Sequence, residues 1–194
     1  MSEKKNKKII IFSSGNGTNA EEIIKYFENK KKVNIHLLLT NNSNAGVLER
    51  AKKYKIPAIF YNNEAFEKKI VFEILNFLNP DLIVLAGFLR KIPDIIISKF
   101  PNKIINIHPA LLPSHGGKGM YGNKVHKSVI RSNDSKTGIT IHFVNGDYDK
   151  GEIILQKSIN VESKDSPESL FKRVQKLEHK FYPLIIEKLL DEQS

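Results

Sequence analysis

Asn106 and His108 are the residues best suited to chemistry in this chain of 194 residues. They lie two positions apart, where an extended segment, Lys103–Ile107, meets a loop bounded by Pro109 and Pro113. Alternate side chains of a strand point the same way, so the amide and the imidazole can converge on one point. Such donors suit an oxygen that becomes negative during acyl transfer. The alternative is that Asn106 caps a strand and His108 is a hydrogen-bonded loop residue.

A glycine-bearing loop, Ser13–Ala20 (SSGNGTNA), joins the first predicted strand to the first predicted helix. Gly15, Gly17 and Ala20 fit a loose dinucleotide pattern, but the next strand ends at Thr40–Asn42 without an acidic residue for a ribose. The loop therefore favours a phosphate held by backbone N–H groups at a helix N-terminus. We expect Gly17 to lie where a side chain would collide with that phosphate. The alternative is a tight turn that binds nothing.

Two carboxylates, Asp147 and Asp149, lie in a predicted hairpin turn, Asn145–Gly151. A carboxylate beside a catalytic histidine would favour the protonated ring, although acidic turn residues are more commonly solvated. The chain has six histidines without close ligand spacing and no cysteine, so we expect no metal site. No chemical role is assigned to three other histidines, His115, His126 and His142.

Two further segments have both a functional and a structural interpretation. Gly87–Ile92 (GFLRKI) can offer a backbone edge and an apolar wall to a flat ring, or it can simply connect a strand to a helix. On the last predicted helix, Gln175, Glu178 and His179 are three and four residues apart and can share one face. That face can bind a ligand or be only solvated.

The elements that must position these residues alternate between strand and helix. We predict strands over Lys8–Ser13, Val33–Thr40, Ala58–Tyr61, Asp81–Ala86, Lys103–Ile107, Thr137–Val144 and Glu152–Val161. We predict helices over Thr18–Asn29, Val47–Tyr54, Glu64–Leu78, Pro93–Lys99, Lys124–Ser132 and Ser166–Leu190. This order implies an α/β fold of three layers, with a mostly parallel twisted sheet, helices on both faces and a late antiparallel hairpin. Ligands bind such sheets at the carboxyl ends of the strands.

Length and composition indicate a single domain over residues 1–194, with residues 1–7 as a flexible basic N-terminus. No apolar run approaches the length of a membrane span, so we expect a cytoplasmic protein without a membrane partner. The net charge of +10 suggests nucleic acid, but only four of the 31 basic residues are arginine. We therefore expect no nucleic-acid partner. A positive surface would instead attract small anions.

Together these motifs resemble the phosphoribosylglycinamide formyltransferase family, folate-dependent enzymes of purine synthesis. The similarity covers Lys8 to about Leu190 and is carried by SSGNGTN (13–19), DLIVLAGFLR (81–90), NIHPALLP (106–113), GITIHFVNGDYDKGEIILQ (138–156) and RVQKLEH (173–179). The resemblance implies a formyltransferase-like, Rossmann-related fold. It also implies formyl transfer from the co-substrate 10-formyltetrahydrofolate to the amine of 5'-phosphoribosylglycinamide, without a metal.

The resemblance assigns roles to three groups of residues. Asn106, His108 and Asp149 match the catalytic trio. The substrate-binding residues are Gly17, Thr18 and Asn19, for the phosphate, and Gln175 and Glu178, for the ribonucleotide. The folate-binding residues are Leu89, Arg90, Lys91 and Ile92, together with Asn106.

Two departures from the family pattern bear on folate binding and on access to the site. Many bacterial members carry an arginine that contacts the folate after the third strand, whereas Tyr61–Phe66 is shorter here and has none. The loop Ser114–Asn123 is longer than in some members, and its glycines predict a mobile cover.

In the implied reaction the amine attacks the formyl carbon, and Asn106 and a protonated His108 stabilise the oxyanion. We expect Asp149 to raise the pKa of His108. Two related alternatives are methionyl-tRNA formyltransferase and formyltetrahydrofolate deformylase, whose extra C-terminal or N-terminal domains would not fit in this chain. A basic nucleotide- or RNA-binding module is an alternative from another class. We expect small-molecule partners and a monomer or homodimer.

Overall fold

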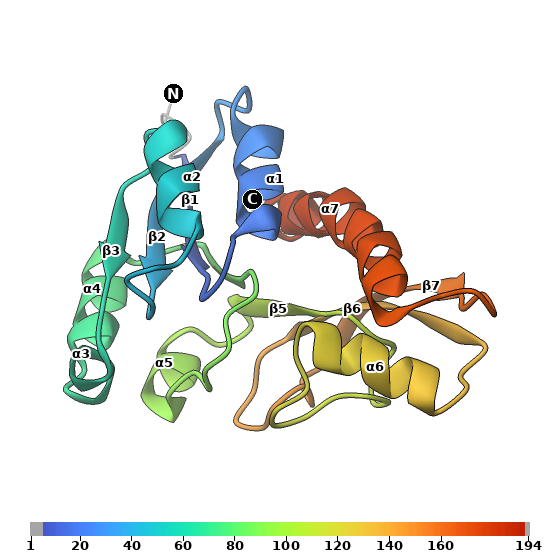
Figure 1. Cartoon of the computed structure of the whole chain (residues 1–194). Coiled ribbons are helices and arrows are strands. Elements are labelled where there is room, and N and C mark those ends of the chain that lie inside the picture. The colour runs from blue at the N-terminus through green and yellow to red at the C-terminus, as the bar shows by residue number, and fades with distance from the viewer. Residues whose placement is uncertain (1–5, 193–194) are drawn as a thin grey trace.

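A computed structural model of the chain describes residues 6–192 and shows one seven-stranded sheet. The strand order is β3-β2-β1-β4-β5-β6-β7 (Figure 1). The parallel strands are β1 (Lys7–Phe12), β2 (Val33–Thr40), β3 (Ala58–Phe60), β4 (Leu82–Leu85) and β5 (Ile104–His108). β6 (Lys136–Phe143) and β7 (Ile153–Asn160) run antiparallel to their neighbours. The predicted mostly parallel sheet with a late hairpin is confirmed.

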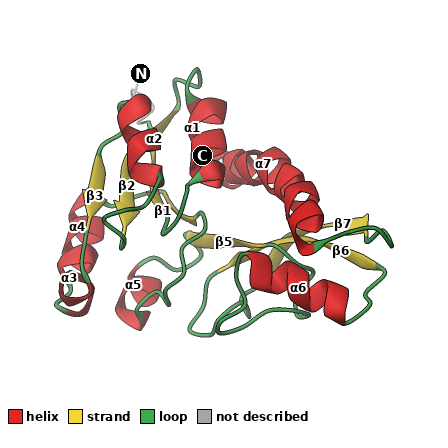
Figure 2. Cartoon of the chain, viewed as in Figure 1, coloured by secondary structure: helices red, strands yellow, loops and turns green. Residues whose placement is uncertain are grey.

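Helices cover both faces of this sheet, as Figure 2 shows. One face carries α1 (Thr18–Phe27), α2 (Val47–Lys53) and α7 (Pro167–Glu192), with α6 (Asn123–Arg131) packed against α7. The other face carries α3 (Asn63–Glu67), α4 (Ile70–Leu78) and α5 (Asp94–Lys99). The three predicted layers are therefore present.

β1 explains why the sheet has a core on each side. Ile9 and Ile11 point into the layer beneath α1 and α7, whereas Ile10 and Phe12 point into the layer beneath α4 and α5. All four side chains are buried. A strand covered on both faces favours an unbroken apolar run, because neither set of alternating side chains meets solvent.

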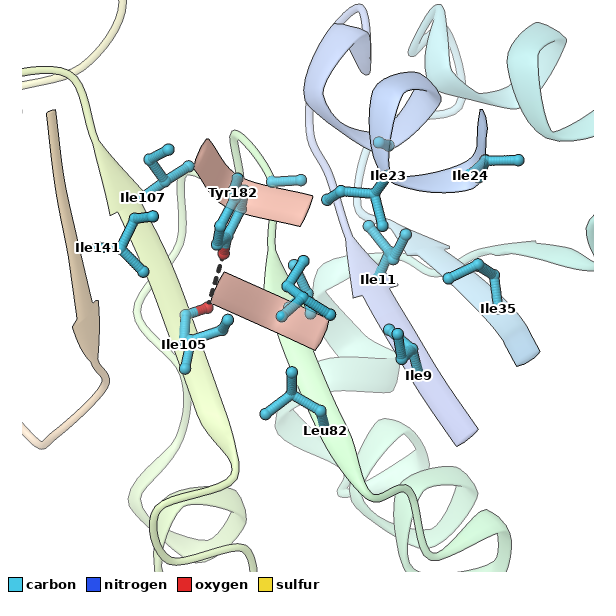
Figure 3. Packing of buried hydrophobic residues seen from close by; sticks show 14 of the residues in the cluster. Ile9, Ile11, Ile23, Ile24, Ile35, Leu82, Ile105, Ile107, Ile141 and Tyr182 are labelled. Atoms are coloured by element: carbon cyan, nitrogen blue, oxygen red, sulfur yellow. Dashed lines mark hydrogen bonds between the residues drawn. The ribbon is translucent and has the colours of Figure 1, made fainter. Parts of the chain in front are cut away.

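α7 is anchored in the first of these core layers by Tyr182, which Figure 3 shows among the isoleucines. The Tyr182 hydroxyl lies 3.0 Å from the Leu85 carbonyl oxygen and 3.2 Å from that of Ile105. It can donate to either one, so the long C-terminal helix is tied to the last residue of β4 and the second residue of β5.

The single helix predicted over Glu64–Leu78 is wrong, because the chain forms α3 and α4 with a break between them. Lys69 has a φ of 63°, in the left-handed region that ends a right-handed helix. The size of Phe77 favours a place in the core, but Val71 and Leu75 are the buried residues of α4 and Phe77 is 87% exposed. α4 is apolar on almost every side, so periodicity could not select the buried face.

Smaller differences concern the ends of elements. Pro93 is the residue before α5 and has an extended ψ of 142°, so it is not the first helical residue as predicted. Of the predicted flexible N-terminus, residues 1–5 lie outside the described part, and Lys7 already begins β1. Within residues 6–192, no helix combines the length and the apolar character that crossing a membrane requires.

Candidate functional site

A cleft of about 810 Å³ lies at the carboxyl ends of β1, β4 and β5. Its lining includes every residue that the sequence analysis assigned to catalysis or binding. These are Gly17, Thr18, Asn19, Leu89, Arg90, Lys91, Ile92, Asn106, His108, Asp149, Gln175 and Glu178. Residues as far apart in the sequence as Gly17 and Glu178 are thus gathered in one place, as expected for a parallel α/β sheet.

Asn106 and His108 are the third and fifth residues of β5, and both reach the cleft. The turn after them is held by a buried hydroxyl that the sequence analysis missed. Thr140 Oγ1 donates to the Ala110 carbonyl at 2.7 Å and accepts from the Leu112 N–H at 3.0 Å. β6 pairs Thr140 directly with His108, so the sheet register places this hydroxyl under the turn.

His108 is buried, and both of its ring nitrogens have partners. Nε2 lies 2.8 Å from the His115 carbonyl oxygen and donates its proton there, while Nδ1 lies 3.5 Å from Asp149 Oδ2. Burial lowers the pKa of His108, and the Asp149 charge opposes that effect. Asp149 therefore acts in the predicted direction. The net direction is downward, opposite to the raised pKa that the sequence analysis expects.

Asp149 lies in the turn between β6 and β7, where a hydrogen bond holds its carboxylate. Its Oδ2 accepts the Gly117 N–H at 2.8 Å, and its backbone has a φ of 56°. Burial acts to raise the pKa of Asp149, but His142, His108 and the Gly117 N–H together hold that pKa below its usual value. Asp147, by contrast, is an exposed turn residue that pairs with Lys150 at 3.5 Å.

His142 is a site residue to which the sequence analysis gave no role. It lies opposite Asn106 in the β5–β6 register. Its Nδ1 donates to the Phe143 carbonyl at 2.7 Å, which leaves Nε2 to accept from the Asn106 amide at 3.2 Å. His142 therefore orients that amide. The alternation of Thr137–Val144 hinted at this position, but only the pairing of β6 with β5 identifies its partner.

The loop Ser13–Ala20 and the start of α1 are joined to α7 by two side-chain hydrogen bonds. Gln175 Nε2 donates to Thr18 Oγ1 at 3.1 Å, and Asn19 Nδ2 donates to Glu178 Oε2 at 2.9 Å. Burial raises the pKa of Glu178 to about 7, against the opposing effect of the Asn19 hydrogen bond. Gln175 and Glu178 thus lie beside this loop and line the cleft, whereas His179 does not line it.

Gly17 is needed for a reason that the sequence analysis did not identify. It has a φ of 71°, and a Cβ built on it would lie 2.2 Å from Val47 Cγ2 of α2. The side chain would therefore collide with the protein itself, and the collision with a phosphate stays a prediction. Because Gly17 precedes the first turn of α1, its backbone still directs the N-terminus of that helix into the cleft.

The segment after β4 is positioned by Ser14. Its hydroxyl donates to Asn41 Oδ1 at 2.6 Å and accepts the Leu89 N–H at 3.1 Å. Phe88 is buried against Phe12, with ring centroids 5.2 Å apart, whereas Leu89 is 48% exposed. The predicted apolar wall thus consists of an anchored backbone with a side chain free to meet a ligand.

The two predicted departures have different positions relative to the cleft. Residues 61–66, which lack the arginine, do not line it. Residues 117–122, which belong to the loop Ser114–Asn123, do line the cleft. Among the described residues, no three His, Asp or Glu side chains gather as a metal site would require.

Comparison with known proteins gives matches over nearly the whole chain. The formyl transferase family model matches residues 7–186. Phosphoribosylglycinamide formyltransferase of Bacillus subtilis is 37% identical over 190 residues, which is 95% of each chain. The chloroplastic enzyme of Arabidopsis thaliana is 37% identical over 198 residues, covering 98% of this chain and 68% of the relative. The crystal structure of the Bacillus halodurans enzyme superposes with a TM-score of 0.87 at 34% identity, over 97% of both chains. Shared sequence and fold together place this chain in the phosphoribosylglycinamide formyltransferase family.

Proposed function

We propose that the cleft transfers the formyl group of 10-formyltetrahydrofolate to the amine of 5'-phosphoribosylglycinamide in purine synthesis. The products are formylglycinamide ribonucleotide and tetrahydrofolate. The observation that carries this proposal is the meeting of Asn106, His108 and Asp149 in the same cleft as the residues assigned to both substrates. An amide donor and a histidine–carboxylate pair are the groups that acyl transfer to an amine requires.

The two substrates bind different parts of the cleft in this proposal. The ribonucleotide phosphate takes backbone N–H groups at the N-terminus of α1, and Gln175 and Glu178 hold the ribose side. The folate ring lies along the backbone of Leu89–Ile92, next to the amide of Asn106. Arg90, Lys91 and Lys118 also line the cleft and attract both anionic substrates.

The neutral state of His108 determines the order of proton transfers. The amine attacks the formyl carbon, and the Asn106 amide donates to the oxyanion that forms. His108 accepts a proton from the newly bonded nitrogen, and Asp149 stabilises the resulting imidazolium. The proton then passes to N10 of the folate as the bond from carbon to N10 breaks and the carbonyl reforms.

Turnover of purified protein with both substrates tests this function, with formylglycinamide ribonucleotide measured by mass. We expect product only when the ribonucleotide is present, and none from the His108→Ala variant. Release of formate from the folate alone would indicate a deformylase. Transfer to methionyl-tRNA, and not to the ribonucleotide, would indicate the other related activity. Either result in folded protein contradicts the proposal.

The other expectations about partners follow from the sequence and from this reaction. We propose that the protein acts on small molecules in the cytoplasm, as a monomer or homodimer, without nucleic acid. Absence of salt-sensitive RNA binding in a filter-binding assay is the expected result.

A further inference from the structure

His115 lies in the loop after β5, and its ring is held at both nitrogens. Nδ1 is 2.9 Å from the Ser128 hydroxyl of α6, and Nε2 is 2.6 Å from Asp134 Oδ2 in the turn between α6 and β6. Only 11% of the His115 side chain is exposed. Two groups from outside the loop therefore fix one side chain within it.

The backbone of the same stretch contacts the catalytic pair. The His115 carbonyl accepts the Nε2 proton of His108 at 2.8 Å, and the Gly117 N–H donates to Asp149 at 2.8 Å. His115 has a φ of 55°, which is unfavourable for a residue with a Cβ. Its side-chain bonds to Ser128 and Asp134 offset that strain, so they hold the carbonyl in place.

We propose that Ser128, His115 and Asp134 form a clamp that positions the catalytic His108 and selects its tautomer. This rests on the proposed role of His108 in formyl transfer. The hydrogen bond made by one ring nitrogen decides where the proton of a neutral histidine resides. Because Nε2–H donates to the His115 carbonyl, Nδ1 is the nitrogen that gains and loses a proton, and it faces Asp149 at 3.5 Å.

The positions of these residues favour positioning over a second reaction. Ser128, His115 and Asp134 are bonded in the order of a hydrolase triad, but none of them lines the cleft. Their connection to the cleft runs through the His115 carbonyl. They are therefore positioning residues, and His108 and Asp149 remain the groups that meet the substrates.

Several titratable groups surround His108, so the effect of the clamp must be separated from theirs. They are Asp149 from the β6–β7 turn, His142 from β6, His115 from the loop and His126 from α6. Burial lowers the pKa of His108, and the Asp149 charge and the His115 carbonyl raise it. Burial also lowers the pKa of His126 to about 4, so that ring is neutral near pH 7. Loss of the clamp should therefore lower the pKa of His108 further.

The test compares Asp134→Asn and Ser128→Ala with Glu28→Gln, which removes an exposed charge at the end of α1. NMR titration of the His108 ring nitrogens in substrate-free protein reports the pKa and the tautomer. We expect both clamp variants to lower the pKa and the fraction with a proton on Nε2. We expect kcat to fall roughly three- to tenfold, the size of one lost hydrogen bond, with KM unchanged for both substrates. Glu28→Gln should change none of these.

Two variants of His115 itself sharpen the result. His115→Ala removes the ring and keeps the backbone strain, whereas glycine accepts the left-handed backbone without strain. His115→Gly should therefore retain more of the Nε2 tautomer than His115→Ala. A His108 titration and tautomer identical to wild type in Asp134→Asn and Ser128→Ala would overturn the proposal. So would a loss of activity without any change in that titration. Absence of formyl transfer by the wild-type protein would refute only the proposed function, because the NMR results judge the clamp independently.

Discussion

Burial and charge act in opposite directions on His108. Its ring is enclosed at the end of β5, which disfavours the imidazolium, while Asp149 lies 3.5 Å from Nδ1 and favours it. A neutral ring can accept a proton from the attacking amine, and the nearby carboxylate limits the cost of holding it. The same surroundings therefore suit both halves of a proton shuttle.

Replacing the catalytic donors should abolish most turnover without unfolding the protein. Asn106→Ala and His108→Ala each remove a group that interacts with the reacting atoms, so we expect kcat to fall at least about a hundredfold. His36→Ala, on β2 and outside the cleft, serves as the control and should stay near wild type. Steady-state kinetics together with circular dichroism check this. Activity within a few-fold of wild type in either variant would remove the role assigned to that residue.

Asp149→Asn separates the charge of this residue from its shape. The amide oxygen can still accept the Gly117 N–H, but the charge that raises the pKa of His108 is gone. That pKa should fall, so the neutral ring persists to lower pH and the acid limb of kcat/KM should move down. The rate should fall at least about tenfold because the imidazolium loses its partner. Asp147→Asn, at an exposed turn carboxylate, should leave the acid limb of kcat/KM and the rate unchanged.

α1 and α7 meet at the side of the cleft that we propose for the ribonucleotide, and their contact buries an acid. The carboxylate of Glu178 is enclosed between these helices with one hydrogen bond from Asn19. Its pKa is raised from 4.5 to about 7, so the folded protein holds a proton there that the unfolded chain releases. The resulting loss of stability begins as pH rises above 4.5 and levels off above about 7.

Glu178→Gln should therefore be more stable relative to wild type at pH 8 than at pH 5. The amide is uncharged at both values, so it avoids the cost of a buried carboxylate. Thermal unfolding of both proteins at the two pH values measures the difference. An equal difference in stability between variant and wild type at pH 5 and pH 8 would contradict the raised pKa of Glu178. At pH 8, where Glu178 is ionised, the same variant should bind the ribonucleotide more weakly than wild type, because a charged acceptor is lost.

α2 and the loop before α1 meet at Gly17, and the closeness of this contact predicts the effect of adding a side chain there. Gly17→Ala should destabilise the fold by about 1–3 kcal/mol, because the new Cβ would overlap Val47 and the φ of 71° is strained for alanine. Gly15→Ala is the matched control, since Gly15 has open space around its Cβ position. Chemical denaturation of both variants tests this. If Gly17→Ala keeps full stability and loses only phosphate binding, the phosphate collision originally predicted is correct.

At the scale of the whole molecule, α7 connects the last part of the described chain with the first, because it contacts both the central strands and the start of α1. The Tyr182 hydroxyl lies within hydrogen-bonding distance of the Leu85 carbonyl of β4 and of the Ile105 carbonyl of β5, and Figure 3 shows the second contact. The Gln175 and Glu178 side chains reach the loop after β1. The proposed site includes residues from Gly17 to Glu178, so it depends on the position of α7, the last helix in the sequence. Packing of that helix decides whether the two halves of the cleft face each other.

Tyr182→Phe should lower stability and leave the chemistry intact. It removes a buried hydroxyl while keeping the ring, so we expect a loss of about 1 kcal/mol and a fall in Tm of about 2–4 °C. Tyr121→Phe removes an exposed hydroxyl and is the control for Tm. A fall in kcat/KM larger than tenfold at a temperature where the variant is folded would show that Tyr182 acts on the site directly.

Much of this protein follows from its sequence alone. Unbroken apolar runs such as Ile9–Phe12 predicted buried strands, because a strand covered on both faces needs apolar side chains at every position. The alternation of strands and helices then predicted which loops meet at the carboxyl edge of a parallel sheet. The individual residues of the site were named from the motifs at these positions together with the resemblance to the formyltransferase family.

Tertiary structure alone decided the partners of those residues. His142 was overlooked because its place opposite Asn106 depends on the register of β6 against β5, which is set by packing between distant segments. Gly17 was explained by a phosphate because nothing in the sequence places Val47 against it. The direction of the His108 pKa shift could not be predicted, because burial depends on every element that encloses the ring, whereas the neighbouring carboxylate is visible in a motif.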